Sequence, residues 1–383
     1  MFIIDPMNQI SHFLSAAFSA VFFVVSFVSC GPSVPGLERK SVPVMETALD
    51  AYVAEASDSA VPLAAVVVLQ HGKVIGERYV NGWQKDSSHH MWSTSKSYTS
   101  LAVGFAVKEG LLSLDDRVCT FFPEYYDKYI DGSDQGKYIA AGTVRDYLVM
   151  ATGQEEDPTW RGILFMRERH PEIVMDENLR GLGAYYDAAG RNLIEDIFLV
   201  PFTKEPGTRN CYNSFATYVL SAILQKVTGE KTVDYLEERL WKPLGISKPE
   251  WLEVNGVSAG GWGLMLSAED MAKTGQMLLD NGCYAGRQVV PADYLAEAVS
   301  PYFTWDPPTF AGPAEKPSYH QGYGYQFWIN GDGYNTAGAQ GQFIIVLPEY
   351  EAVIVGIADI KDDDHKEMAL MWKYIVPVLK QEL

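Results

Sequence analysis

Positive charge is in short supply in this sequence: 30 Lys and Arg stand against 49 Asp and Glu, a formal net charge of −19. A nucleic-acid partner needs a basic face, and an anionic membrane surface attracts basic segments, so we expect neither as a partner. Cysteine is also rare: the 383 residues include four, which are too few for a disulfide framework. The composition, 47% hydrophobic and 21% charged, is that of a globular protein with one two-lobed domain or two domains.

The N-terminus carries a hydrophobic run without charges, residues 13–29, followed by Cys30. This run is short for a membrane-spanning helix and has the length of a signal-peptide core, although no Lys or Arg precedes Arg39. The residues around Cys30 resemble a bacterial lipoprotein cleavage box. We therefore expect residues 1–30 to be a signal peptide, Cys30 to be lipidated, and the protein to be exported, either periplasmic or anchored. An uncleaved anchor, or a start at Met7, remains open.

Turn and cap signals divide the rest of the chain. After a linker over residues 31–43, a helix is expected over 44–56. Two β-rich runs, 63–70 and 73–80, are separated by His71-Gly72, a pair that suits a two-residue hairpin turn. Two segments have the pattern of a helix start, a Ser or Thr with a carboxylate three residues later: Thr143–Asp146 and Ser267–Asp270. Three glycines directly follow apolar-periodic stretches and indicate helix ends: Gly110, Gly229 and Gly282.

The C-terminal part returns to β-branched and aromatic runs, which predict strands over 323–329, 342–347 and 352–358 and a closing helix over 365–379. This order predicts an α+β domain, residues 44–383, with one antiparallel sheet built from both chain ends and flanked by helices. The sheet lobe would comprise 44–90 and 300–383, and an inserted helical lobe 91–299. Residues 302–341, rich in Gly, Pro and aromatics, are expected to form a long loop-bearing segment.

A Ser-x-x-Lys pattern, Ser93 to Lys96, precedes an apolar-periodic stretch that ends at Gly110. The spacing predicts a helix that begins near Ser93, with both side chains on one face. A lysine partly removed from water loses affinity for its proton and can act as a base toward the serine. Such a four-letter pattern also arises by chance, as a Ser/Lys helix end that faces water.

Several blocks in order resemble the class C branch of the serine β-lactamase and penicillin-binding superfamily, over residues 46 to 380. They are 93–116, 143–153, 259–278 and 281–291. This resemblance implies the β-lactamase/transpeptidase-like fold, with Ser93 as nucleophile and Lys96 as its partner. It also places Tyr212 on the catalytic tyrosine of a Tyr-x-Asn element, where the third letter is Ser214 instead of Asn and Asn213 comes one place early. A serine hydroxyl there can still accept from Lys96, but it is shorter.

The third element of the branch, Lys- or His-Thr-Gly, is matched by Thr336-Ala337-Gly338. The resemblance implies substrate contacts by Ser214, Thr336 and Gly338, and an oxyanion hole made by the backbone N–H groups of Ser93 and Ala339. The cation that grips a carboxylate in the family is missing from this strand. In this respect the segment resembles the esterase and 6-aminohexanoate-dimer hydrolase relatives more.

These residues together predict a serine hydrolase that forms an acyl-enzyme on a small amide or ester, without metal or organic cofactor. A penicillin-binding D-Ala carboxypeptidase or true β-lactamase is the alternative, and its carboxylate-binding cation would have to come from Lys316 or Arg287. A further alternative is a non-catalytic envelope lipoprotein that only binds. Membrane contact is expected only through the signal segment or lipid anchor, and the oligomeric state is left open.

Three other features carry less weight. His89-His90 lie beside the nucleophile but lack a third ligand at suitable spacing for a metal. Cys211 adjoins Tyr212, and a small buried residue is its expected role; at least one cysteine should remain a free thiol. The aromatic residues of 323–328 suit an apolar substrate pocket or ordinary strand packing equally well.

Overall fold

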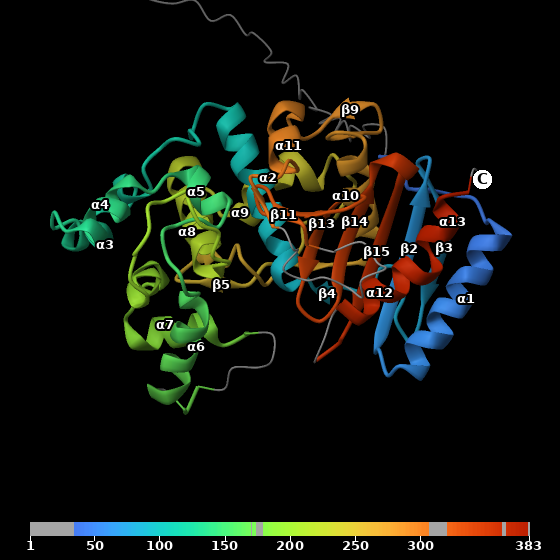
Figure 1. Ribbon diagram of the computed structural model, residues 1–383, viewed down its shortest axis with the longest axis horizontal. Coiled ribbons are helices and arrows are strands. Elements are labelled where there is room, and N and C mark those ends of the chain that lie inside the picture. Colours follow the sequence, from blue (N-terminus) through green and yellow to red (C-terminus); the bar gives the residue numbers. More distant parts are fainter. Residues whose placement is uncertain (1–33, 170, 174–178, 306–319, 362–364, 382–383) are drawn as a thin grey trace, which may run out of the picture. The chain divides into compact units, whose positions relative to one another are not determined.

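The computed structural model describes residues 34–169, 171–173, 179–305, 320–361 and 365–381. Within residues 34–383, nine strands of the described part form one sheet in the order β1-β3-β2-β15-β14-β13-β12-β11-β10. Their bounds are β1 Glu38–Arg39, β2 Leu63–Gln70, β3 Lys73–Tyr79, β10 Phe303–Thr304, β11 Gly322–Tyr323, β12 Trp328–Asn330, β13 Gly333–Gly338, β14 Gln342–Leu347 and β15 Ala352–Ala358. Strands from the two ends of the sequence thus lie side by side (Figure 1), as predicted.

The sheet is antiparallel except at one edge, where β1 pairs in parallel with β3. This short strand lies inside the range that we expected to be a linker. The β2–β3 hairpin has its predicted turn: His71 and Gly72 both have positive φ, 51° and 76°, which a two-residue type I′ turn requires. The predicted strand over 323–329 is wrong as one piece, because Gln326 has φ 63° and a turn separates β11 from β12. The predicted loop-bearing segment likewise carries β10 to β13 in its described part.

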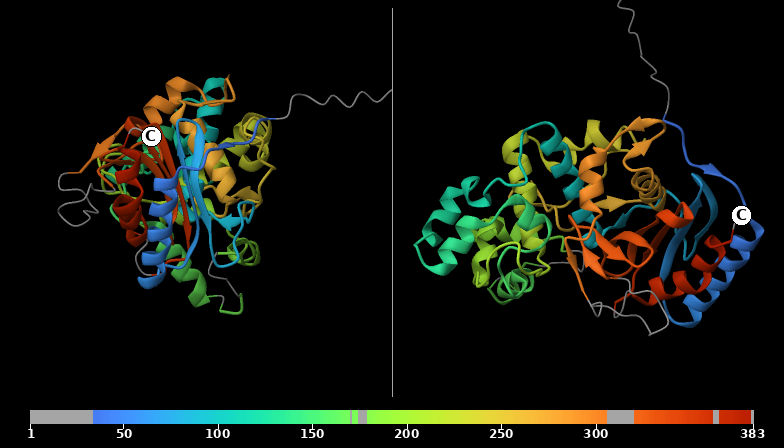
Figure 2. Two further views of the ribbon diagram at one scale, coloured as in Figure 1. Left: turned by 90° about the vertical axis from the view of Figure 1, so that its right-hand side faces the viewer. Right: turned by 45° about the horizontal axis from the view of Figure 1, so that its top comes forward.

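Helices cover both faces of the sheet. On one face α1 (Pro43–Asp58), α12 (His365–Tyr374) and α13 (Val376–Leu379) lie together (Figure 2) and enclose one apolar core. On the other face α10 (Ala268–Leu279) packs across β2, β14 and β15. This helix belongs with the sheet, although the sequence analysis assigned its residues to the helical lobe. The pattern of one face of α10 alone could not tell which layer it would cover.

The remaining described helices make up the inserted helical lobe or lie beside it. They are α2 Ser95–Lys108, α3 Pro123–Tyr126, α4 Asp134–Ala141, α5 Val144–Leu148, α6 Pro158–Arg169, α7 Leu182–Ala189, α8 Ser214–Thr228, α9 Thr232–Tyr235 and α11 Ala292–Ala298. Short two-stranded sheets join β4 (His89–His90) to β7 (Met265–Leu266), β5 (Glu253–Val254) to β6 (Val257–Ser258), and β8 (Cys283–Tyr284) to β9 (Arg287–Gln288). In the described residues no helix is both long and apolar enough to cross a bilayer.

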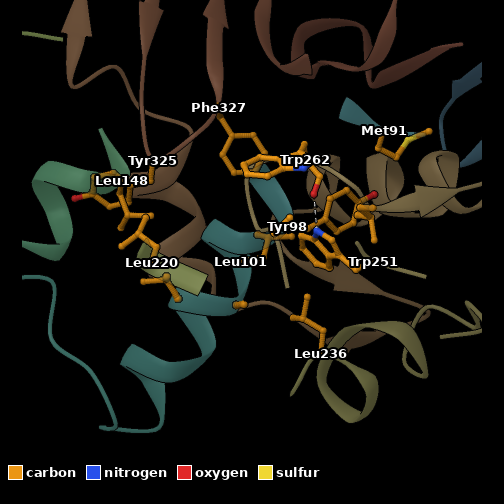
Figure 3. Packing of buried hydrophobic residues seen from close by; sticks show 14 of the residues in the cluster. Met91, Tyr98, Leu101, Leu148, Leu220, Leu236, Trp251, Trp262, Tyr325 and Phe327 are labelled. Carbon is orange, nitrogen blue, oxygen red and sulfur yellow. Dashed lines mark hydrogen bonds between the residues drawn. The ribbon is translucent and has the colours of Figure 1, made fainter. Parts of the chain in front are cut away.

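Local signals account for the helix ends. Thr143 and Ser267 are N-caps of α5 and α10, and in each capping box the carboxylate three residues on bonds back to the N-cap backbone, as predicted. Gly229 ends α8 with φ 76°, a conformation that costs other residues energy. Helix α2 is buried on all sides from Ser95 to Ala106. Figure 3 shows part of this packing, where Tyr98 and Leu101 lie in the core and the Trp251 indole donates to the Trp262 carbonyl at 2.8 Å.

The contact between α10 and the sheet gives a stability prediction. A methyl group added at Gly275 would lie 2.4 Å from Cγ1 of Val353 and 3.0 Å from Cγ2 of Ile344. Overpacking of this kind costs about 1–3 kcal/mol, which exceeds the gain of up to about 1 kcal/mol from replacing a helical glycine. Gly275→Ala should therefore lower the free energy of unfolding in urea. Gly36→Ala is the matched control, since a methyl group there meets nothing within 4 Å; a Gly275→Ala protein as stable as wild type would contradict the analysis.

Candidate active site

Ser93 lies in a short 3₁₀ turn, Trp92–Thr94, that leads directly into α2. Trp92 has φ 45°, a left-handed conformation that is rare for a bulky residue and for which the surroundings must compensate. The turn is held at both ends: the Met91 N–H donates to the carbonyl of Leu264 at 2.8 Å, and the Thr94 N–H donates to that of Met91 at 3.0 Å. Local strain of this type gathers at functional sites, and no sequence signal announced it.

The predicted Ser–Lys pair is in contact. Nζ of Lys96 lies 2.8 Å from Oγ of Ser93 and also donates to the carbonyl of Gly261 at 2.8 Å. The Lys96 side chain is 1% exposed, and this burial lowers its pKa to about 7. At neutral pH a large fraction of Lys96 is therefore uncharged and able to accept the proton of Ser93.

Two glycines bring the second acceptor of Lys96 into place. A side chain at Gly261 would lie 2.8 Å from the carbonyl oxygen of Ser214, and one at Gly260 would lie 2.9 Å from that of Thr217. The backbone of this loop thus passes close against the first turns of α8. The same closeness allows the Gly261 carbonyl to reach Lys96, an acceptor that the sequence analysis did not include.

Tyr212 precedes α8 and lies at Lys96, whose Nζ is 4.9 Å from the centre of the Tyr212 ring. The ring stacks on Trp328 with centroids 5.6 Å apart. Ser93, Lys96 and Tyr212 are therefore gathered in one place, as the sequence predicted. Their catalytic roles remain predictions.

Asn213, which stands one place early for the family pattern, is the N-cap of α8. Its Oδ1 accepts from the Ala216 N–H at 3.0 Å and its Nδ2 donates to Gln154 at 2.9 Å. This asparagine is fully buried and structural. Ser214 is the first residue of α8, and its N–H donates to Oγ1 of Thr159 at 3.1 Å. A substrate contact by Ser214 remains a prediction.

Strand β13 lies against the turn that contains Ser93, Trp92–Thr94, called here the nucleophile turn. A side chain at Gly338 would be 2.3 Å from the carbonyl oxygen of Met91, so only glycine allows this approach. Thr336 is 1% exposed, and its hydroxyl lies 3.3 Å from that of Thr94 and accepts from the Ile344 N–H at 3.2 Å. Its hydroxyl is thus engaged inside the protein, and a substrate contact by Thr336 remains a prediction. Ala339 is exposed in the turn that follows β13.

Asp157 was missed by the sequence analysis. It lies at the start of α6, where its carboxylate accepts from the Thr159 N–H at 2.9 Å, and its negative charge acts on Lys96 in the direction of a higher pKa. Burial in turn raises the pKa of Asp157 itself. The Asp-Pro-Thr triplet indicates a helix start, but nothing in the sequence indicates that this start faces Lys96.

The remaining candidates have other surroundings. Nε2 of His89 lies 3.3 Å from Oδ1 of Asp359, and His90 packs edge-on against Trp92. Tyr325 and Phe327 are buried and pack in the core, whereas Trp328 is half-buried beside Tyr212. Tyr325 and Phe327 thus serve the packing of the core, whereas Trp328 lies at the candidate site. The three cysteines of the described part are half-buried free thiols: Cys119, Cys211 and Cys283.

The two alternative sources of a carboxylate-binding cation stay predictions. Arg287 is exposed in β9, and Lys316 lies outside the described residues, as does Cys30. No group of three or more His, Cys, Asp or Glu in the described part is arranged as metal ligands.

Comparison with known proteins identifies the family to which the chain belongs. The family model named Beta-lactamase matches residues 49–372. The chain belongs to the β-lactamase family. A 6-aminohexanoate-dimer hydrolase of Paenarthrobacter ureafaciens is 26% identical over 310 residues, 78% of this chain and 73% of that protein. Lovastatin esterase of Penicillium rubens is 23% identical over 192 residues, 48% of this chain and 46% of the esterase.

A solved structure agrees with the fold. An octameric penicillin-binding protein homologue of Pyrococcus abyssi has a TM-score of 0.63 at 18% identity, with 88% of this chain and 78% of that chain covered. The β-lactamase/transpeptidase-like fold predicted from the sequence is thereby confirmed. So is the class of the protein, a serine hydrolase of the β-lactamase family.

The pKa of Lys96 gives a prediction for the pH profile. If neutral Lys96 is the base, kcat/KM for hydrolysis of p-nitrophenyl acetate should rise roughly tenfold per pH unit below pH 7 and level off above it, since Lys96 loses its proton near a pKa of about 7. Initial rates between pH 5 and 9 measure this limb.

Asp157→Asn should move the midpoint of that limb to lower pH, because it removes a negative charge that favours protonated Lys96. Glu156→Gln is the matched control, because Glu156 is an exposed neighbour in the same loop and is not among the groups that shift the pKa of Lys96. This variant should leave the midpoint in place. A midpoint that stays fixed or rises in Asp157→Asn would show that Lys96 is not the group that titrates.

Proposed function

We propose that this protein hydrolyses small amides or esters through an acyl-enzyme formed on Ser93. The observation that carries the proposal is the contact of 2.8 Å between Oγ of Ser93 and Nζ of Lys96, a buried lysine whose pKa is lowered to about 7. A serine beside a neutral amine has the base that it needs, because the proton can leave as the oxygen attacks.

In the proposed acylation, Oγ of Ser93 attacks the carbonyl carbon of the substrate while its proton passes to Lys96. The carbonyl oxygen becomes an oxyanion, stabilised by the backbone N–H groups of Ser93 and Ala339. The tetrahedral intermediate then collapses: the bond to the leaving amine or alcohol breaks, and that group takes a proton from Lys96 by way of Tyr212. Water, deprotonated by the same pair, attacks the acyl carbon of the ester on Ser93. The bond from that carbon to Oγ then breaks, Oγ takes the proton back from the pair, and the acid is released.

The surroundings of the pair favour a substrate without a carboxylate next to the reacting carbonyl. Thr336 stands where the family has its cation, and its hydroxyl is engaged with Thr94 and Ile344. The carboxylate of Asp157 adds negative charge at Lys96. Among the described residues, an anionic group would meet the negative charge of Asp157 here. Amides and esters with neutral acyl groups therefore suit the site better than a penicillin or a peptide ending in D-Ala. The relatives named as dimer hydrolase and esterase lend this choice support.

Labelling of Ser93 tests the function. The purified protein should gain one phosphonyl group from a fluorophosphonate by intact mass, and Ser93→Ala should lose both the label and at least about 10³-fold of its esterase activity with its melting temperature unchanged. Ser113→Ala, an exposed serine away from the pair, is the control and should behave as wild type.

Penicillin distinguishes the alternatives in the same experiment. A penicilloyl adduct or rapid penicillin loss would favour the carboxypeptidase or β-lactamase function. A folded wild-type protein that neither reagent labels would favour a binding protein without catalysis.

We also propose that the protein is exported and lipidated at Cys30, on the strength of the hydrophobic run over residues 13–29 and the residues that surround Cys30. Expression of the full chain in a bacterial host fed with radioactive palmitate should label it, and Cys30→Ala should remain unlabelled. Cys283→Ala, which removes another thiol, should keep the label. Unlabelled wild-type protein in the soluble fraction would refute lipidation.

A further inference from the structure

The turn that carries Ala339 is a tight hairpin between β13 and β14, residues 338–342, and the chain around it holds it by its carbonyl groups. Ile360 donates its N–H to the carbonyl of Gln340 at 3.0 Å, and Ala358 donates to that of Gly341 at 3.0 Å. From the nucleophile turn, Oγ1 of Thr94 donates to the carbonyl of Gln342 at 2.9 Å. The hairpin is thus tied to both β15 and the turn that contains Ser93.

A buried acid lies behind this hairpin. Glu367, on α12, is 0% exposed. A methyl group added at Gly341 would lie 2.3 Å from its Oε2, and one added at Gly356 of β15 would lie 2.4 Å from its Oε1. The two glycines therefore leave the space that the carboxylate fills, one on the hairpin and one on the neighbouring strand.

Tyr52 of α1 holds the other end of this contact, because its hydroxyl donates to Oε1 of Glu367 at 3.3 Å. Burial and the nearby Glu367 raise the pKa of Tyr52, so that its hydroxyl keeps its proton and remains a donor. A carboxylate away from water is stable only while its polar partners stay in place. Movement of Gly341 away from Glu367 would open a gap beside this buried polar group, and the loss of packing resists displacement of the hairpin.

We propose that Glu367 is a positioning residue for the oxyanion hole: its carboxylate, packed between Gly341 and Gly356, fixes the hairpin on which the Ala339 N–H is presented. This inference rests on the proposed function, in which Ala339 stabilises the oxyanion. Glu367 touches no substrate and acts only through the backbone of residues 338–342. Its effect should therefore fall on the chemical step and leave ground-state binding alone.

The length of the side chain is the property to test. Glu367→Asp keeps the carboxyl group but withdraws it by one methylene from Gly341. We expect kcat for p-nitrophenyl acetate to fall roughly tenfold while KM stays within about twofold, since small displacements in a catalytic site have large effects on rate. Glu367→Gln keeps the length and should stay within about threefold of wild type. Circular dichroism and the melting temperature establish that each variant is folded at the assay temperature.

A matched control separates positioning from general loss of stability. Asp196 is another fully buried carboxylate, which accepts a hydrogen bond from Tyr186 at 2.5 Å. Asp196→Asn should lower the melting temperature without lowering kcat at a temperature where it is folded. If the Glu367 variants do not fold, Tyr52→Phe, which removes only the hydroxyl that holds the carboxylate, should lower kcat about threefold.

Two outcomes would overturn the proposal. One is a folded Glu367→Asp with wild-type kcat, or, where the Glu367 variants do not fold, a folded Tyr52→Phe with wild-type kcat. The other is a Glu367→Gln protein as impaired as Glu367→Asp, which would make the carboxyl group itself, and not the length of the side chain, the important property. Failure of the proposed function would differ from both, because the wild-type protein would then not be phosphonylated on Ser93 at all.

Discussion

A lysine amine kept out of water beside a serine hydroxyl is the interaction on which the rest of this site depends. Removing an ammonium from water is unfavourable, so Lys96 is held there by the packing of a helix that is buried on all sides. Its two polar partners come from different parts of the chain, the turn before α2 and the loop at Gly261. Both segments must therefore be folded against α2 before the amine acquires its lowered pKa.

The glycines near the site serve this same requirement. Gly261 lets a loop lie against α8 so that its carbonyl reaches Lys96, and Gly338 lets β13 approach the turn before Ser93. In both places a single methyl group would collide with a backbone oxygen. The polar groups of the site are thus positioned by close contacts between backbone segments. Unlike a side chain, the backbone cannot relieve such a contact by changing rotamer.

Much of this arrangement was predictable from local signals. The β2–β3 turn, the two capping boxes and strands β14 and β15 follow from residue types at fixed spacing, and so does the Ser93–Lys96 contact, because i and i+3 share a helix face. The parallel edge strand, the turn at Gln326 and the proximity of Asp157 to Lys96 could not be predicted. Each depends on which segments meet in space, and a short apolar or acidic run does not carry that information.

Cys211 directly precedes Tyr212, and the environment around it has a chemical consequence of its own. Burial raises the pKa of the Cys211 thiol to about 11, with the carboxylate of Asp157 acting in the same direction. At pH 7 only roughly one thiol in ten thousand is then ionised, and the thiolate is the form that reacts with peroxides, disulfides and alkylating agents. Burial of the Cys211 thiol, with the nearby Asp157 acting in the same direction, thus disfavours its oxidation next to Tyr212.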